Sequence, residues 1–237
     1  ANAIRRRLGS PDMVAVQEVE DLELLSALGA RAGEYQAVLL KGCDFSNINV
    51  GLLYNPARIR IVSTSQLQTE APQFRKGPCT LADGRAFAQI LFDRPPLRVD
   101  LVAGSTPVTV IVNHWRSQIG GRNEQRQASA DFLAAELAAL ASANLVLLGD
   151  FNDTEGSEPL LALAGALGLT NLSWFSPLET RYSLLFEGVS QAFDHILVSP
   201  ALLDRLRASG FAHSNADFPA ESRAADHDNP WAHLALP

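Results

Sequence analysis

Lysine is nearly absent from this chain of 237 residues, and the formal net charge is −7. The two lysines are Lys41 and Lys76, and all other Lys/Arg positions are arginines. No long basic run occurs, which argues against tight, non-specific binding to nucleic acid through phosphate contacts. A nucleic acid substrate is not excluded, because arginine forms forked bonds to phosphate and a bound cation can add local positive charge.

Long apolar runs are also lacking. The longest, such as 108–112 and 145–148, have the length of a strand and fall far short of the roughly 20 residues of a membrane span, so we expect no stable membrane insertion. The basic start of the chain leads into no apolar signal core, so any targeting peptide has been removed or was never present. Cys43 and Cys79 have no metal-binding spacing, which leaves one disulfide or two inert thiols. Low lysine and a possible bridge favour a secreted or periplasmic protein.

The composition, 47% hydrophobic and 19% charged, is typical of an ordinary globular protein. We expect one domain over residues 1–237. Hydrophobic patterning predicts strands at 12–16, 35–40, 49–54, 59–62, 87–92, 97–102, 108–113, 145–148, 182–186, 193–198 and 231–236. It predicts helices at 3–8, 20–28, 123–141, 159–167 and 200–208, with a loop over 63–85. This order indicates an α/β (α+β) fold, a two-sheet β-sandwich flanked by helices.

Glu18 follows the first buried strand. A carboxylate at such a strand end can hold a hard cation such as Mg²⁺ together with water and substrate phosphate. The alternative is a glutamate placed at a helix N-terminus, where the helix dipole favours it.

His114 leaves an apolar strand in the sequence Asn113-His114-Trp115-Arg116-Ser117. A histidine there can donate to a phosphoryl oxygen or to a leaving group near neutral pH. The alternative is a polar pair that caps the strand by bonding to loop backbone.

Asp150 and Asn152 follow the continuous apolar run of 145–148. In extended backbone, residues i and i+2 point to the same face, so the carboxylate and the amide can act together on a water and a phosphoryl oxygen. Gly149 lets the backbone approach a ligand closely. The alternative is an Asx-rich turn, for which Asp153 and Thr154 would suffice.

Two Asp-His steps occur, at Asp194-His195 and Asp226-His227. A carboxylate that orients an imidazole makes it a better base for activating water. If the two segments meet, the aspartate of one can orient the histidine of the other. Isolated Asp-His pairs have no function in most proteins, so this interpretation depends on the two segments meeting.

Together these motifs resemble the endonuclease/exonuclease/phosphatase superfamily, which includes DNase I-like nucleases, sphingomyelinases and inositol phosphatases. The matching pieces, in the order of the superfamily, are Gln17-Glu18, Asn113 to Ser117, Gly149-Asp150-Phe151-Asn152-Asp153, Asp194 to Ser199 and Asp226-His227-Asp228-Asn229-Pro230. Leu53-Tyr54-Asn55-Pro56 and Arg94-Pro95-Pro96-Leu97 extend the resemblance over nearly the whole chain. Within the superfamily, the sequence is most similar to bacterial secreted nuclease-like members. The resemblance implies a DNase I-like four-layer fold.

The resemblance implies a role for each matched residue. Glu18 and Asp226 would coordinate the cation, which would be Mg²⁺ or Mn²⁺, with Ca²⁺ possible. His227, oriented by Asp194, would activate the attacking water or stabilise the charge of the transition state. Asp150 would assist the nucleophile or the leaving group, and His114 would donate to an oxygen of the phosphate. Substrate binding would fall to Asn152, Arg116 and Asn49, with Asn49 also able to orient His114, whereas His195 would be structural.

The implied function is a metal-dependent phosphodiesterase, first of all a nuclease acting on DNA or RNA as a monomer. The alternatives are a phosphatase or phospholipase-like hydrolase of small or lipid phosphates, and an inactive binding module with the same fold. The superfamily begins with a core strand ending in an Asn that helps to bind metal and phosphate. This chain opens inside the helix after that strand, so we expect the first core strand to be missing and the domain to be N-terminally incomplete.

Overall fold

The computed structural model describes residues 1–74, 77–140 and 143–237. Its strands are β1 (Met13–Val19), β2 (Gln36–Leu39), β3 (Asn49–Tyr54), β4 (Ile59–Gln66), β5 (Cys79–Thr80), β6 (Ala86–Phe87), β7 (Leu97–Ala103), β8 (Thr106–His114), β9 (Leu145–Asp150), β10 (Thr170–Asn171), β11 (Leu184–Phe186), β12 (Val189–Gln191), β13 (Asp194–Val198), β14 (Leu206–Ala212) and β15 (Asn229–Leu234). Its helices are α1 (Leu22–Gly33), α2 (Asn123–Leu137), α3 (Glu158–Leu167) and α4 (Pro200–Leu203), with short helical turns η1 (Ala3–Arg7), η2 (Pro72–Phe74), η3 (Ala138–Leu140), η4 (Leu172–Phe175) and η5 (Leu178–Thr180).

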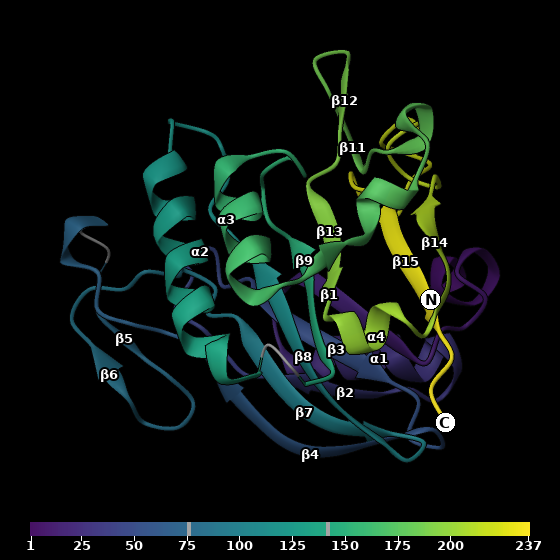
Figure 1. The fold of residues 1–237 in the computed structure, drawn as a ribbon, viewed down its shortest axis with the longest axis horizontal. Coiled ribbons are helices and arrows are strands. Elements are labelled where there is room, and N and C mark those ends of the chain that lie inside the picture. Colours follow the sequence, from purple (N-terminus) through teal and green to yellow (C-terminus); the bar gives the residue numbers. More distant parts are fainter. Residues whose placement is uncertain (75–76, 141–142) are drawn as a thin grey trace.

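The two largest sheets pack face to face between helices, which gives the expected four layers. One sheet has the order β1-β3-β2, and the other has the order β10-β13-β9-β8-β7-β4. Helix α1 covers the first sheet, while α2 and α3 lie side by side over the outer face of the second (Figure 1). Three separate apolar cores fill the three spaces between these layers.

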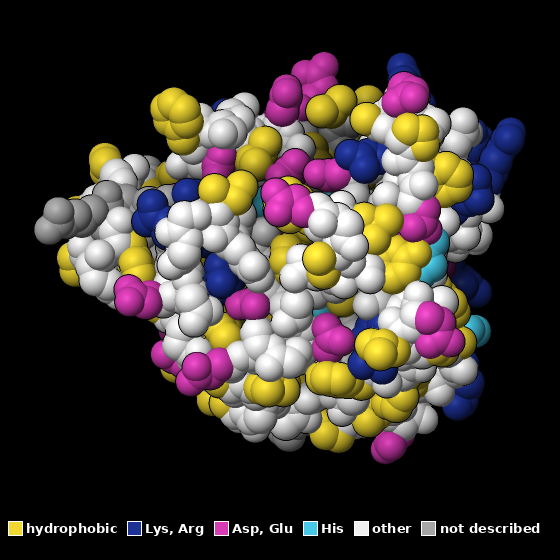
Figure 2. Space-filling view, turned by 90° about the horizontal axis from the view of Figure 1, so that it is seen from above, with side chains coloured by type: hydrophobic (Ala, Val, Ile, Leu, Met, Phe, Trp, Pro, Cys, Tyr) yellow, Lys and Arg dark blue, Asp and Glu magenta, His cyan; other side chains and the backbone are white. Residues whose placement is uncertain are grey.

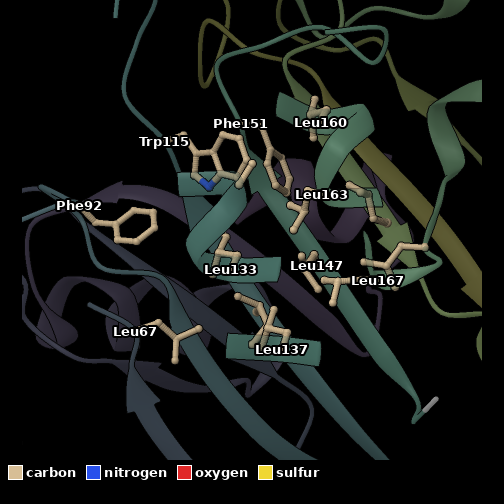
Figure 3. Close-up of a cluster of buried hydrophobic side chains, with 14 of the residues drawn as sticks. Leu67, Phe92, Trp115, Leu133, Leu137, Leu147, Phe151, Leu160, Leu163 and Leu167 are labelled. Atoms are coloured by element: carbon tan, nitrogen blue, oxygen red, sulfur yellow. The ribbon is translucent and has the colours of Figure 1, made fainter. Parts of the chain in front are cut away.

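The alternation of apolar side chains along the central strands explains this layering. In β9, Leu145 and Leu147 pack under α2 and α3, whereas Val146 and Leu148 point into the space between the two sheets. A strand that is apolar on both faces must be covered on both faces, so the continuous apolar run predicted the central position of β9. The outer core beneath α2 and α3 is drawn in Figure 3, where Leu147 lies among the leucines of the two helices.

Most of the predicted elements are confirmed, but two predicted helices ended at the wrong residue. Helix α1 continues past Gly29 to Gly33, because Gly29 packs closely against the backbone of Tyr35 inside the helix and does not end it. The predicted helix 200–208 ends at Leu203, and β14 follows it to pair with β15. Helix α2 ends at Leu137 and continues as η3, while position 141 of the prediction lies outside the described residues.

The predicted strand 87–92 was also wrong. Within the described residues this stretch holds the end of β6 and one isolated bridge between Ile90 and Glu70. Side chains take the place of a partner strand: Glu70 accepts from two successive backbone N–H groups, and Gln68 accepts from those of Leu91 and Phe92. Residues 63–85 are predicted as a loop with short extended pieces. The short strand β5 confirms this, but β4 continues into the segment as far as Gln66.

Two further features bear on expectations from the sequence. Cys43 and Cys79 form a disulfide, which resolves the open choice between a bridge and free thiols. Across a separation of 36 residues, such a bridge stabilises the fold by about 4 kcal/mol in the chain-entropy view. No helix in the described part of the chain is long and apolar enough to cross a membrane.

Strands β1 and β15 each have one edge without a strand partner among the described residues. β1 pairs with β3, and β15 pairs with β14. β1 nevertheless carries apolar side chains on both faces, with Ala15 in the core between the sheets and Val14 in the core under α1. This is the pattern of an interior strand. The extra core strand expected from the resemblance stays a prediction.

Replacement of Gly149 by alanine tests how β9 is held against β8. Gly149 has a φ of +126°, and an added Cβ would overlap the backbone carbonyl of Asn113 on the neighbouring strand. We expect Gly149→Ala to lower the free energy of unfolding by more than about 2 kcal/mol in urea titrations. The matched control is Gly165→Ala in α3, where a Cβ meets open space and should be neutral or stabilise by up to about 1 kcal/mol. Equal effects of the two substitutions would contradict this account.

Candidate active site

Three candidate side chains lie in one row across three neighbouring strands. β8 runs parallel to β9 with His114 beside Asp150, and β13 runs antiparallel to β9 with Asp194 on the other side of Asp150. Directly opposed residues point to the same face of a sheet, so all three side chains leave it together. They continue the face on which Val112 and Leu148 pack between the two sheets. The row lies at the end of the sheet below the β11–β12 hairpin (Figure 1).

A β-bulge brings Glu18 to this row. The register of β1 against β3 slips by one residue between Val16 and Val19, and Glu18 has a φ of +59°. Simple alternation would place Glu18 on the same face as Val16, towards α1. The bulge redirects it, and Glu18 Oε1 lies 3.9 Å from His114 Nε2. A positive φ is costly for a glutamate, and such strain is concentrated at functional sites.

Asp194 and His227 meet in space, as the interpretation of the two Asp-His steps required. His227 Nδ1 lies 2.6 Å from Asp194 Oδ2. Burial alone would lower the pKa of His227, but the hydrogen bond and the charge of Asp194 outweigh burial and raise it to about 9. His227 is therefore held by Nδ1, so Nε2 is the nitrogen that can exchange a proton with a substrate or a water.

Asp150 is buried and held by Asn152. Its Oδ1 accepts from the backbone N–H of Asn152 at 2.7 Å, and its Oδ2 accepts from the side-chain amide of Asn152 at 3.1 Å. Burial raises the pKa of Asp150 to about 8, and the negative charge of Asp194 adds to the rise. Asn152 also has a positive φ, of 50°, so the turn that places its amide is strained. A carboxyl group with such a pKa is suited to transferring protons near neutral pH.

His114 is buried and neutral. Burial lowers its pKa well below the usual value, and the positive charges of Arg94 and His227 lower it further. Its Nε2 lies 3.6 Å from Asp150 Oδ2, whereas its Nδ1 is buried without a hydrogen-bond partner. Because an unpartnered N–H is more costly than an unpartnered lone pair, we assign the proton to Nε2. His114 thus points its single N–H donor at the row of carboxylates.

Asp150, Asp194 and His227 each offer a ligand atom, and these atoms lie within 4.8 Å of one another. Carboxylate oxygens are the ligands that hard divalent cations prefer. The raised pKa of Asp150 shows that two carboxylates cannot readily stay ionised here side by side, and a cation between them would relieve that repulsion. The residues present therefore fit a divalent cation. Glu18, whose side chain is 65% exposed, is positioned to take part from the opposite sheet.

The other predicted site residues are placed less directly. Asp226 is exposed next to His227, and no contact in the structure joins it to Glu18, so their joint role as ligands stays a prediction. Arg116 Nη1 lies 3.3 Å from Asp93 Oδ2. The prediction that Asn49 orients His114 was wrong: its amide nitrogen donates to the carbonyls of Val19 and Glu20, and its oxygen accepts from a backbone N–H.

Some residues of the site were not predicted as such. Ser183 Oγ accepts from the backbone N–H of Phe193 and of Asp194, and the Ser183 carbonyl accepts from Asp228, so one residue fastens both segments that carry the Asp-His pair. Nothing in its local sequence distinguishes this serine. Arg94 donates to the carbonyls of His114 and Trp115, and its signal was present in the Arg94-Pro95-Pro96-Leu97 match. His195 is fully buried and bonded through both ring nitrogens, as expected of a structural residue.

The face that contains this end of the sheets shows no broad basic patch (Figure 2). Acidic side chains, in magenta, are scattered over its middle, while many of the dark blue basic side chains lie towards the right edge. Negative charge collected around buried carboxylates attracts cations and repels phosphate unless a cation neutralises it.

The comparisons with known proteins agree with this arrangement. A model of the endonuclease/exonuclease/phosphatase family matches residues 1–227, which include every candidate residue above. The chain belongs to this family. A comparison with curated protein sequences finds no significant match. Membership of the family confirms the resemblance drawn from the motifs and makes the protein a relative of phosphoester hydrolases.

Solved structures of the family's DNase I-like fold are similar to the chain over nearly its full length. A humanized TDP2 from D. rerio with 14 mutations is 14% identical, with a TM-score of 0.70 over 97% of this chain and 87% of that one. The mannosyl-6-phosphatase Bt3783 of Bacteroides thetaiotaomicron VPI-5482 is 16% identical, with a TM-score of 0.72 over 99% and 89%. An AP endonuclease from Archaeoglobus fulgidus is 16% identical, with a TM-score of 0.65 over 99% and 96%. At these identities, the likeness establishes the fold alone.

The raised pKa values at the site predict how stability changes with pH in the presence of a chelator. Asp150 holds its proton up to about pH 8 in the fold and His227 up to about pH 9, whereas the unfolded chain releases both earlier. Stability is therefore lost as the pH rises, and Asp150 alone should account for about 2 kcal/mol between pH 6 and pH 8. Asp150→Asn should remove that part of the loss in urea titrations. Asp131→Asn, an exposed aspartate of α2, should keep the wild-type slope, and the same slope in Asp150→Asn would contradict the prediction.

Proposed function

We propose that the protein is a metal-dependent phosphodiesterase that hydrolyses DNA or RNA through in-line attack of water on phosphorus. The observation that carries this proposal is the row of His114, Asp150 and Asp194, closed by His227 on Asp194 and by Glu18 on its bulge. This one site combines groups that transfer protons, a hydrogen-bond donor for the phosphate and carboxylates that can bind a cation.

The cation of the proposal is Mg²⁺ or Mn²⁺, with Ca²⁺ as a further candidate. Glu18 and Asp226 are the proposed ligands, and the carboxylates of Asp150 and Asp194 are further donors beside Glu18. When bound, such a cation neutralises charge that develops on the phosphoryl oxygens. Removal of the cation by a chelator should abolish hydrolysis, and re-addition should restore it.

In this proposal Asp150 transfers a proton and His227 supplies positive charge. Asp150 has a pKa close to neutral pH, and in its ionised form it takes the proton of the attacking water. His227 is positively charged at neutral pH because of its raised pKa. It therefore stabilises the negative charge of the transition state through Nε2, the nitrogen not bonded to Asp194.

The remaining residues bind the phosphate. His114 donates from Nε2 to a phosphoryl oxygen, and its buried Nδ1 keeps the tautomer fixed. Asn152 orients Asp150 through its backbone N–H and its side-chain amide, and the amide would donate to a phosphoryl oxygen in exchange for one of its present bonds to Asp150 or to the Trp115 carbonyl. Arg116 is the nearest predicted arginine in sequence to His114 and would move from Asp93 to a phosphate of a longer substrate.

The choice of substrate has support on both sides. Solved structures of the same fold include an AP endonuclease and a TDP2 complexed with a single-stranded DNA product, which favours nucleic acid. The alternative is a small or lipid phosphoester, supported by the net charge of −7 and by the scattered acidic side chains on the face of the site. The Cys43–Cys79 disulfide supports the proposal that the protein is secreted or periplasmic, because disulfides persist in oxidising compartments.

Hydrolysis assays with purified protein test the function. Plasmid DNA, RNA, a bis-nitrophenyl phosphodiester and a nitrophenyl monoester are each offered with Mg²⁺, Mn²⁺, Ca²⁺ or a chelator. We expect metal-dependent cleavage of nucleic acid and of the synthetic diester. His227→Ala and Asp194→Asn should each reduce kcat by about 10² to 10⁴-fold, since both break the pair that places the positive charge of His227 at the site.

The matched control is His233→Ala, which removes an exposed histidine on β15 and should keep full activity. Cleavage confined to monoesters or lipids would support the alternative substrate class. No cleavage with any cation, or cleavage that survives in His227→Ala, would contradict the proposed mechanism.

A further inference from the structure

The segment between β2 and β3 is fastened to the body of the protein at several points. Cys43 in this segment is bonded to Cys79 at the start of β5. The side-chain amide of Gln66 donates to the carbonyls at positions 40 and 41. Gly42 lies so close to the Arg-Pro-Pro turn that an added Cβ would come within 2.7 Å of Pro95 Cδ. The segment is therefore held directly against that turn.

Asp44 and Arg94 form a buried ion pair at this contact. Arg94 Nη1 lies 3.0 Å from Asp44 Oδ2, and each side chain is 9% exposed. Breaking one half of such a pair leaves an uncompensated buried charge, so the position of the guanidinium depends on the carboxylate. Asp44 follows Cys43 directly in the chain, so the disulfide fixes the carboxylate that fixes Arg94.

The other edges of the Arg94 guanidinium face the catalytic strand end. Nη2 donates to the carbonyl of Trp115 at 2.9 Å, and Nε donates to the carbonyl of His114 at 3.4 Å. The Trp115 carbonyl also accepts from the side-chain amide of Asn152 at 3.1 Å, and that amide donates to Asp150 as well. One carbonyl thus connects Arg94 to the amide that orients Asp150.

We propose that Arg94 is a positioning residue for the proposed hydrolysis, and that the Cys43–Cys79 disulfide, acting through Asp44, keeps it in place. Arg94 fixes the backbone of His114 and Trp115, and through the shared carbonyl it fixes Asn152 and Asp150. Formation of the disulfide therefore raises the catalytic rate as well as the stability of the fold. This inference rests on the proposed function, so its test has one readout that does not need activity.

The first readout is amide hydrogen exchange in Arg94→Gln and Asp44→Asn. The N–H of Trp115 donates to the Asp150 carbonyl and that of Asn152 donates to the Asp150 carboxylate, so both report the geometry of the site. We expect their exchange to become about tenfold faster in both variants while the amides of Leu133 in α2 and Leu163 in α3 keep wild-type rates. Arg98→Gln, which breaks the pair with Asp100 on β7, is the matched control and should leave Trp115 and Asn152 unchanged.

The second readout is steady-state hydrolysis of the bis-nitrophenyl phosphodiester with Mn²⁺. Misplacement of Asp150 should lower kcat by about 100-fold in Arg94→Gln and Asp44→Asn. KM should change by much less, because Arg94 itself bonds the protein backbone and does not bind phosphate. Arg94→Lys keeps a positive charge for Asp44 but lacks the fork for two carbonyls, so it should recover less than a tenth of the rate. The double variant Cys43→Ser with Cys79→Ser, assayed well below its midpoint of unfolding, should lose kcat as Asp44→Asn does.

The outcomes separate the two proposals. Unchanged exchange at Trp115 and Asn152 in Arg94→Gln, or faster exchange that is equal at Leu133 and Leu163, would overturn the positioning role. Full kcat in the disulfide-free double variant would overturn the part played by the bridge. If the variants show the selective exchange changes but the wild-type protein hydrolyses no substrate, the structural connection is confirmed and the proposed function is rejected. The connection then has no catalytic role.

Discussion

The close approach of Gly149 to the backbone of Asn113 is the contact on which the site depends. Because no side chain separates the two strands there, β8 and β9 stay paired to their ends and His114 lies beside Asp150. β13 then pairs on the other side of β9 and adds Asp194 to the row. The layered cores keep this register, since a slip of one residue would exchange the face between the sheets with the face under α2 and α3.

The same arrangement places two carboxylates close enough to repel each other. Two carboxylates, Asp150 and Asp194, lie together at a mostly buried strand end, and burial and repulsion leave one of them holding a proton. His227 forms a hydrogen bond to Asp194, while the neutral His114 points Nε2 at Asp150. Rigid support comes from residues without catalytic chemistry: Ser183 fastens the segments of Asp194 and Asp228, and Arg94 fastens the backbone after β8. Precision of a site is obtained from such fixed surroundings.

The sequence was sufficient where local patterns decide. The apolar runs of β8 and β9 predicted buried strands, and so the position of His114 and of Asp150 at strand ends, because a period of two and burial on both faces are local signals. Long-range or irregular features were beyond it. The direction of Glu18 depends on a bulge that the local sequence does not predict. Asn49 was misassigned because the carbonyls of Val19 and Glu20, distant in sequence at the end of β1, accept from its amide. β14 was missed because its pairing with β15 decides its structure.

The proton on Asp150 makes the binding of a divalent ion depend on pH. A divalent ion that enters beside Asp150 and Asp194 must expel the proton that Asp150 holds, so uptake of the ion exchanges two positive charges for one. Such an exchange makes the apparent affinity for the ion rise steeply with pH and makes ion uptake acidify an unbuffered solution.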